Sequence, residues 1–305
     1  MRLLLAIAFM FAATATWAEP QNACANADAL GISRVAEIDT TGGPRFGEQY
    51  PGDHLLQAGE VVLTFDDGPF PNDTKAILDA LAAQCTKATF FNVGSMAAAN
   101  PDLAKEVAGQ GHTVGTHTWS HANLAWLSQG RSIGQIETAF TVEQRLLGGG
   151  VAPFFRFPYL SAPKRLVAYL ATRNIAVFSV DVDSMDYRAR SPGAIVHRVM
   201  GELAKRHKGI ILFHDIHAVT AKALPTVLSE LKAKGFKVVH LVPKTALTTL
   251  PAYDRPAPSQ VLASKSPGEQ IDAKTHVSTK LRLFRHGWTP TPSDVNGAIQ
   301  LQYRR

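Results

Sequence analysis

The chain is poor in cysteine and, beyond its N-terminus, in long hydrophobic runs. Only Cys24 and Cys85 are present, an even number that permits one disulfide in an oxidising compartment, the alternative being two separate buried thiols. No segment after residue 15 offers the roughly 20 apolar residues that a membrane-spanning helix needs. No glycine-rich phosphate-binding loop follows the first predicted strand, because residues 66–69 are Asp, Asp, Gly and Pro. These absences disfavour further membrane spans and a Rossmann-type cofactor site.

A concentrated basic stripe is also missing from the body of the protein. The formal net charge is +6, but from Arg255 onward eight Lys or Arg residues stand against three acidic ones, an excess of five. The body is therefore close to neutral, so we expect no nucleic-acid partner. The basic tail admits two interpretations, electrostatic association with an anionic envelope surface or a solvated linker.

The first 18 residues have the pattern of a secretory signal peptide. Met1 and Arg2 precede an apolar run from Leu3 to Ala15, and small residues stand before the polar Glu19. This run of about 13 residues is too short to span a bilayer, so we predict cleavage after Ala18 rather than an uncleaved anchor. The pattern predicts an exported protein, periplasmic or extracellular, whose mature chain is long enough for one large domain.

Short apolar runs alternate with helical patterns from Val61 onward, which predicts an α/β fold. Seven strands are expected, at Val61–Asp66, Lys87–Val93, Thr113–His117, Phe154–Phe157, Ile175–Val182, Gly209–His214 and Lys237–Leu241. The expected helices include Asp73–Gln84, Ser132–Leu147, Pro192–Arg206 and Ala221–Lys234, with Asn72 and Ser191 as N-caps. Without an obvious doubly wound break, this order indicates a distorted (β/α)7 barrel of the TIM-barrel type.

The two ends of the chain lack this alternation. Residues 19–57 are rich in Gly and Pro turns and are predicted to be an irregular lead-in. The barrel is expected over residues 58–245. Residues 246–305 are expected to form a Pro/Ser-rich linker and a basic C-terminal tail.

Reactive side chains fall where the predicted strands end. They are Asp66 and Asp67 on the first strand, His117 on the third, Arg156 on the fourth, Asp186 after the fifth and His214 on the sixth. The carboxyl ends of the strands of a parallel barrel meet at one rim, where active sites are built. The positions therefore predict a single functional site.

His117 and His121 are four residues apart, so a helical turn would point both imidazoles to the same side. Alone, such a pair is more often found at the surface or in a cap. With a carboxylate from the same rim it becomes a set that leaves coordination positions open, as in a catalytic metal site. The adjacent Asp66 and Asp67 either form a strand-end turn or divide two tasks, one ligating the metal and the other accepting a proton from the attacking water.

Five short motifs occur in order along the chain: Thr-Phe-Asp-Asp-Gly-Pro at 64–69, His-Thr-Trp-Ser-His at 117–121, Arg-Phe-Pro-Tyr at 156–159, Asp-Ser-Met-Asp-Tyr at 183–187 and Leu-Phe-His at 212–214. In these motifs the chain resembles the polysaccharide deacetylases of the NodB-homology type, carbohydrate esterase family four. Members of that family usually have Trp where Tyr187 stands, so this departure concerns the shape of the pocket for the acetyl group.

The resemblance implies three groups of site residues. They are the metal ligands Asp67, His117 and His121; the catalytic residues Asp66 (general base), His214 (general acid), Arg156 (brace of Asp66) and Asp186 (partner of His214); and the substrate-binding residues Tyr159, Tyr187 and Leu212. The backbone N–H of Tyr159 would stabilise the oxyanion, and Tyr187 and Leu212 would line the slot for the acetyl methyl group.

The activity expected from the resemblance is metal-dependent removal of N-acetyl groups from N-acetylglucosamine units of a cell-wall, chitin-like or exopolysaccharide glycan. Zinc is the expected metal, with cobalt or nickel as substitutes. An O-acetyl xylan esterase, a hydrolase of a non-carbohydrate amide and a catalytically silent glycan-binding protein stay open as alternatives. A non-haem iron oxygenase is disfavoured because Asp66, His214 and Arg156 would have no role there. The polymer and the oligomeric state are not determined by the sequence.

Overall fold

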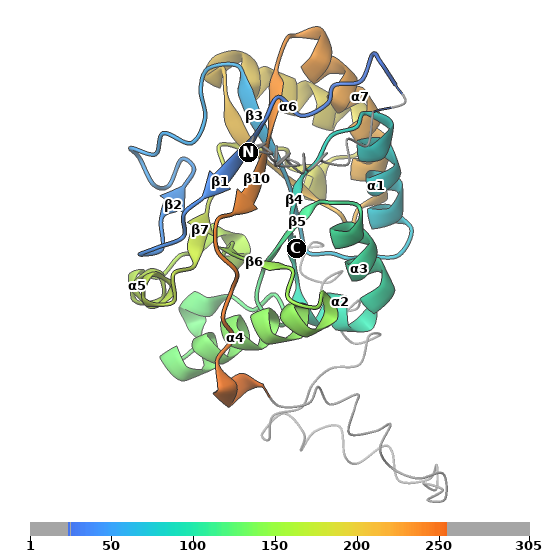
Figure 1. The fold of residues 1–305 in the computed structure, drawn as a ribbon. Helices are drawn as coiled ribbons and strands as arrows, with labels where there is room; N and C mark the ends of the chain where they lie inside the picture. The colour runs from blue at the N-terminus through green and yellow to red at the C-terminus, as the bar shows by residue number, and fades with distance from the viewer. Residues whose placement is uncertain (1–23, 25, 255–305) are drawn as a thin grey trace, which may run out of the picture.

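The computed structural model describes Cys24 and residues 26–254 (Figure 1). The predicted signal peptide and most of the predicted tail lie outside these residues, so both stay predictions. Within the described residues, no helix combines the length and the apolar character that crossing a membrane requires.

A parallel sheet forms the centre of the molecule. Its strands are β1 (Arg34–Ile38), β2 (Arg45–Phe46), β3 (Glu60–Asp66), β4 (Thr89–Asn92), β5 (Thr113–Thr116), β6 (Val151–Phe155), β7 (Ala176–Phe178), β8 (Val182–Asp183), β9 (Gly209–His214) and β10 (Lys237–Pro243). β3 lies in the middle and pairs with β4, β9 and β10. All of its residues are buried, as expected of a strand that is covered on both faces.

The strands curve almost into a ring. The hydrogen-bonded order from β9 runs through β3, β4, β5, β6 and β7, and β8, shortly after β7, pairs back with β9. The predicted strand Ile175–Val182 is divided into β7 and β8, and the carbonyls of Phe178 and Ser179 at the division accept hydrogen bonds from the side chain of Arg156. The predicted α/β class is confirmed, and the architecture is that of a distorted barrel that is open at this point.

Seven α-helices of the described chain lie around the strands (Figure 1). They are α1 (Asp73–Ala83), α2 (Gly94–Ala99), α3 (Pro101–Gly109), α4 (Gln129–Leu146), α5 (Lys164–Thr172), α6 (Pro192–Arg206) and α7 (Ala218–Ala233). The predicted bounds of α6 are confirmed, and the hydroxyl of Ser191 accepts from the N–H of Ala194 at 3.3 Å. Asn72 stands at the N-cap position of α1 as predicted, but its φ is 70° and its side chain makes no capping hydrogen bond.

The lead-in that was expected to be irregular contributes two strands. β1 pairs with β10 along its whole length, and β2 pairs with β7. The described start of the expected linker is also packed, because Leu247 is buried and Arg173 donates to the carbonyl of Thr248 at 2.8 Å. The folded unit therefore extends beyond the predicted barrel at both ends.

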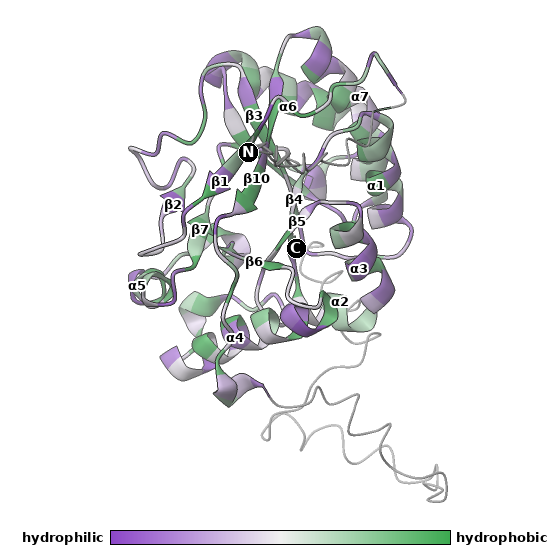
Figure 2. Cartoon of the chain, in the orientation of Figure 1, coloured by the Kyte–Doolittle hydropathy of each residue, from purple (hydrophilic) through white to green (hydrophobic). Residues whose placement is uncertain are grey.

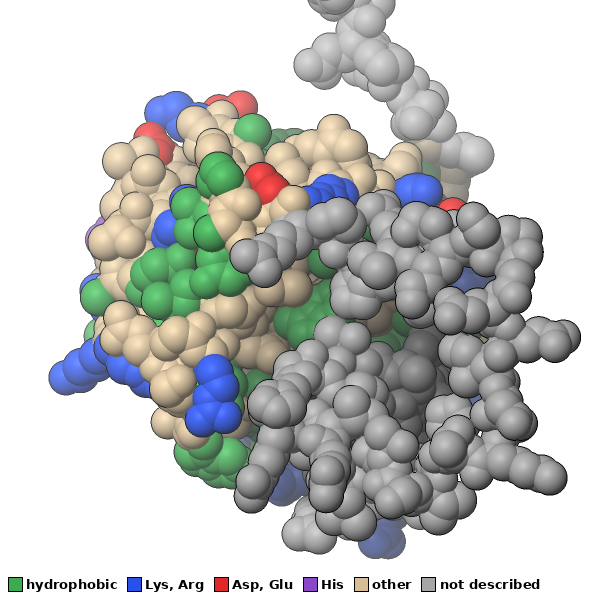
Figure 3. Space-filling view, turned by 90° about the horizontal axis from the view of Figure 1, so that it is seen from below, with side chains coloured by type: hydrophobic (Ala, Val, Ile, Leu, Met, Phe, Trp, Pro, Cys, Tyr) green, Lys and Arg blue, Asp and Glu red, His purple; other side chains and the backbone are tan. Residues whose placement is uncertain are grey.

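Hydrophobic residues are concentrated in the interior. Figure 2 shows them along β6, β7 and β10, with hydrophilic residues spread over the surrounding helices. The largest cluster of buried side chains joins β3, α1, α6, β9 and α7. On the face seen from below, hydrophobic side chains gather in one part of the coloured surface and Lys and Arg lie separately around it (Figure 3).

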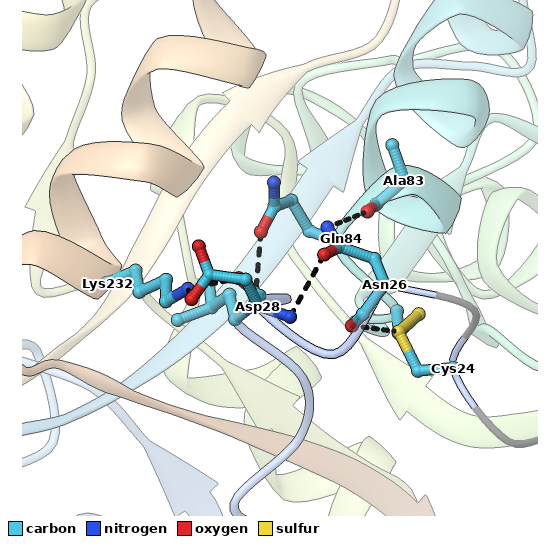
Figure 4. Close-up of a disulfide and its surroundings, with 8 residues drawn as sticks. Cys24, Asn26, Asp28, Ala83, Gln84 and Lys232 are labelled. Carbon is cyan, nitrogen blue, oxygen red and sulfur yellow. Dashed lines mark hydrogen bonds and ion pairs between the residues drawn. A yellow bond between two sulfur atoms is a disulfide. The ribbon is translucent and has the colours of Figure 1, made fainter.

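Of the two alternatives for Cys24 and Cys85, the structure has the disulfide, which ties the start of the described chain to the end of α1 (Figure 4). Asn26 donates to the carbonyl of Ala83 at 3.3 Å, and Asp28 forms an ion pair with Lys232 of α7. The bond encloses a sequence separation of 61 residues. The segment that leads into β1 is thus attached to both α1 and α7.

Removing this bond is expected to destabilise the protein. A Cys24→Ser/Cys85→Ser variant should lose about 2 to 4 kcal/mol of unfolding free energy, because the unfolded chain is no longer restricted by a long loop. Urea unfolding measures the change, with Lys232→Ala as a control that removes only the neighbouring surface ion pair. Equal urea midpoints for the double variant and the wild type would contradict this account.

Candidate active site

Asp67, His117 and His121 lie together beyond the ends of β3 and β5. The Oδ1 atom of Asp67 is 3.6 Å from Nε2 of His117 and 3.3 Å from Nε2 of His121. One ligand atom from each residue lies within 4.8 Å of the other two, and all three side chains are buried. The structure therefore assembles the predicted set of two imidazoles and one carboxylate.

The ring of His117 is oriented for ligation. Its Nδ1 lies 2.7 Å from the carbonyl oxygen of Arg156, so Nδ1 carries the proton and Nε2 presents its lone pair toward Asp67. Burial lowers the pKa of His117 to about 4 although the neighbouring carboxylates favour the charged form, so the imidazole is neutral at pH 7. A buried, neutral, oriented imidazole beside a second one and a carboxylate fits a divalent metal such as zinc.

The segment from His117 to His121 is a bent loop and not the helical turn considered from its spacing. Thr118 and His121 have φ values of 70° and 54°. The carbonyls of Thr118 and Trp119 each accept from the first residues of α2, Gly94 and Ser95, at 2.9 Å. The loop brings the two histidines together by left-handed residues that the spacing alone does not predict.

Asp66 is held by a buried arginine. Nη1 of Arg156 donates to Oδ1 of Asp66 and to the hydroxyl of Thr64, both at 2.7 Å, while Nη2 donates to the carbonyl of Ser179 at 3.2 Å. The guanidinium is fully buried and lies 4.3 Å from the ring centroid of Phe91. The charge-assisted bond orients the carboxylate. The two adjacent aspartates thus contact different partners.

His214 forms the second charged pair. Its Nδ1 lies 2.7 Å from Oδ1 of Asp186, whose Oδ2 accepts from the backbone N–H of His214 and from the hydroxyl of Thr220, each at 2.7 Å. Burial opposes the charged imidazole, but the Asp186 carboxylate outweighs it and raises the pKa of His214 to about 10. His214 is therefore protonated at neutral pH. It stands directly opposite Asp66 in the register of β9 with β3.

The three predicted substrate-binding residues surround these groups. The ring of Tyr159 is half exposed and its centroid lies 4.7 Å from that of His121. The ring of Tyr187 stands edge-on to His214 at 5.6 Å, and Leu212 is a buried residue of β9, two positions before His214. All ten residues predicted from the sequence therefore lie at the same rim of the barrel.

Sequence reasoning missed Asp215, which supports the turn of Asp67. Its Oδ1 accepts from the N–H of Gly68 at 2.9 Å, and its Oδ2 accepts from the hydroxyl of Thr74 at 2.6 Å. A Cβ at Gly68 would lie 2.0 Å from Oδ2, so only glycine fits there. Asp67 itself has a φ of 80°, which an L-residue rarely adopts. The sequence feature that could have pointed to Asp215 is its position as an acidic residue directly after His214, where a buried strand ends.

Comparison with known proteins agrees with this geometry. Residues 56–177 match the family model of the polysaccharide deacetylases. A peptidoglycan N-acetylglucosamine deacetylase of Listeria monocytogenes is 34% identical over 182 residues, covering 59% of this chain and 38% of that protein. A chitin deacetylase of Colletotrichum lindemuthianum is 32% identical over 217 residues, covering 66% of this chain and 86% of that protein. A solved peptidoglycan deacetylase of Bdellovibrio bacteriovorus matches with a TM-score of 0.64 and 33% identity, covering 70% of this chain and 60% of that one.

The chain belongs to the polysaccharide deacetylase family. It spans 38% of the length of the Listeria relative, so that similarity concerns one part of the larger protein. The matched region ends at residue 177, before Asp186 and His214. The pairing of β9 with β3 brings His214 to the same site, and Asp186 reaches it through its contact with Nδ1 of His214.

The support of Asp67 by Asp215 leads to a test on metal affinity. An Asp215→Ala variant should bind zinc about 10- to 100-fold more weakly, because the turn that presents Asp67 loses its acceptor. Thr74→Val should have a smaller effect in the same direction. Zinc titration by calorimetry measures both.

The half-buried Asp181 serves as the control for this test. Asp181 accepts the N–H of Ile210 at 2.8 Å and does not contact the turn, so Asp181→Ala should leave the zinc affinity close to that of the wild type. Thermal unfolding of the metal-free proteins separates loss of the fold from loss of the site. An Asp215→Ala protein with wild-type zinc affinity would show that Asp215 has no part in metal binding.

Proposed function

We propose that this protein is an exported, zinc-dependent polysaccharide deacetylase that releases acetate from N-acetylglucosamine units of a glycan. One observation carries the proposal: a set of metal-binding residues, a carboxylate braced by a buried arginine and a protonated histidine lie at one rim. The relatives named as peptidoglycan and chitin deacetylases support an N-acetylated glycan as the substrate.

Asp67, His117 and His121 would hold the zinc ion. Three protein ligands leave positions open for substrate and water, and the bound ion would act as a Lewis acid on the acetyl carbonyl. The buried surroundings of these side chains exclude bulk water, which strengthens every electrostatic interaction in the site.

Asp66 acts as the general base and removes a proton from the attacking water. Arg156 holds this carboxylate in place through a charge-assisted hydrogen bond, so the base is oriented for the proton transfer. As the water oxygen bonds to the acetyl carbon, negative charge develops on the carbonyl oxygen. The backbone N–H of Tyr159 donates a hydrogen bond to that oxygen in our proposal.

His214 acts as the general acid. An amine leaves poorly unless it is protonated, and the pKa of about 10 that Asp186 sustains against burial keeps a proton on His214. The proton passes to the sugar nitrogen as the carbon–nitrogen bond breaks. Tyr187 and Leu212 form the apolar slot for the acetyl methyl group, with Tyr in place of the family's usual Trp.

The open alternatives differ in what they require of these residues. A silent glycan-binding protein needs neither the Asp66–Arg156 pair nor the His214–Asp186 pair, and both are intact. An O-acetyl esterase has less need of a general acid, because an alcohol leaves more readily than an amine. The separate base and acid therefore favour an amide substrate.

Acetate release provides the direct test. The mature protein should release acetate from N-acetylated chito-oligosaccharides or peptidoglycan, and a chelator should abolish the release until zinc is restored. Asp66→Asn should lower kcat by about 10² to 10⁴, because the base is lost. Acetylated xylan and a simple aryl acetamide in the same panel distinguish the ester and non-carbohydrate alternatives. Tight glycan binding without acetate release would overturn the proposal in favour of a binding protein.

The His214–Asp186 pair predicts a specific pH profile. In the wild type, activity should persist into alkaline solution, since His214 loses its proton only as the pH rises through its pKa of about 10. Asp186→Asn removes the charge that raises this pKa, so the alkaline limb of kcat/KM should move down toward the ordinary value of 6.5. Asp183→Asn is the matched control, because Asp183 binds the N–H of Met185 and does not contact His214. If the alkaline limb of the kcat/KM profile is unchanged in Asp186→Asn, His214 is not the general acid.

A further inference from the structure

A groove of about 1170 Å³ lies between the N-terminal segment 42–53 and α5. One wall is β2 with the loop after it, and the other is α5 with the turn that precedes it. β2 and α5 lie next to one another at the left side of Figure 1. The N-terminal wall precedes the region that matches the family, residues 56–177. The family match therefore covers the α5 wall of the groove but not the N-terminal wall.

The groove lies next to the catalytic rim through Leu160 and Gln49. Leu160 lines it and directly follows Tyr159. Gln49 of the opposite wall donates to the carbonyl of Leu160 at 3.1 Å and accepts from the hydroxyl of Ser179 at 3.0 Å. The carbonyl of Ser179 in turn accepts from Arg156, the partner of Asp66. A polymer whose reacting unit lies beside Tyr159 would place its neighbouring units at the mouth of this groove.

The N-terminal wall packs closely against the residues behind it. A Cβ at Gly43 would lie 2.5 Å from the Cα of Ala171 in α5, and one at Gly47 would lie 2.8 Å from the carbonyl carbon of Ser179. Both glycines have positive φ, so no other residue fits there without strain. Asp53 accepts the N–H groups of Gly47 and Leu55 at 2.8 and 3.2 Å, which closes the loop. The groove is thus preformed, which reduces the entropy that binding costs.

The lining suits a sugar chain that carries negative charge. Two exposed cations, Arg45 and Lys164, stand on opposite walls. The guanidinium of Arg45 lies 5.4 Å from the ring centroid of Tyr50, which limits its motion. Asp53 is the acid of the lining, and both its oxygens already accept backbone N–H groups. Aromatic and aliphatic side chains between the cations, such as Phe46, offer the apolar face that a sugar ring packs against.

We propose that this groove binds a carboxylate-bearing sugar unit next to the unit that is deacetylated, with Arg45 and Lys164 recognising the carboxylate. The inference rests on the proposed function and names its substrate class: an acidic glycan, in which N-acetylglucosamine alternates with a carboxylated sugar, rather than a neutral chitin-like chain. The groove then sets the preference between polymers that share the same acetylated unit.

The test compares three glycans of equal length: an acidic strand of alternating N-acetylglucosamine and N-acetylmuramic acid without peptides, the same strand with its carboxylates amidated, and chitohexaose. The wild type should prefer the acidic strand over the amidated one. Arg45→Ala/Lys164→Ala should raise KM for the acidic strand about tenfold at unchanged kcat, the size expected for losing two solvent-exposed ion pairs. Its KM for the two neutral glycans should change by less than about twofold, and added salt should weaken only the wild-type preference.

A matched control removes two exposed cations elsewhere. Lys105 and Lys234 lie on α3 and just after α7, outside the groove, so Lys105→Ala/Lys234→Ala should keep the preference for the acidic strand. Equal wild-type KM values for the acidic and amidated strands would overturn the inference, and so would an equal loss on all three glycans in the groove variant. Calorimetric binding of the three glycans gives the same comparison without turnover. Selective binding of the acidic strand without acetate release would therefore support the groove while refuting the proposed activity.

Discussion

The buried guanidinium of Arg156 is the interaction on which the site depends. It donates to Thr64 and Asp66 on β3 and to the carbonyls of Phe178 and Ser179, where the ring of strands opens. The carbonyl of the same residue accepts from the imidazole of His117 after β5. A charge this deeply buried is tolerated only where it is paired and hydrogen-bonded. The hydrogen bonds of this one residue therefore hold four strands, Asp66 and His117 in a single arrangement.

Two neighbouring carboxylates are accommodated in this small space because their partners are separate. Asp66 continues the direction of β3 and meets Arg156, whereas the left-handed backbone at Asp67 turns the next carboxylate toward the two histidines. Asp215 stabilises that turn by accepting a hydrogen bond from the N–H of Gly68. The two adjacent side chains are thus held by different partners and turned in different directions.

The N-terminal segment extends the family barrel in this protein. The disulfide to the end of α1 fixes its start, β1 adds to β10, and β2 adds to β7 beside the opening of the ring. Gln49 then joins this added layer to the turn that follows Tyr159. The same segment therefore stabilises the edge of the sheet and shapes the surface next to the catalytic rim, which couples the stability of the fold to the form of the binding surface.

The sequence by itself determined the barrel strands, helix α6 and the residues of the site. Apolar runs mark buried strands, and the carboxyl ends of parallel strands must converge, so Asp66, His117 and His214 could be placed together before any contact was known. The tertiary structure alone decided the rest. The strands β1 and β2, the division of the strand after Ile175, the bent loop at His121 and the support by Asp215 depend on contacts between residues far apart in the chain. Asp215 meets Gly68 across 147 residues, and Ser179 meets Gln49 across 130. Local periodicity reports which face of an element is buried, but it carries no information about which distant backbone group a polar side chain will satisfy.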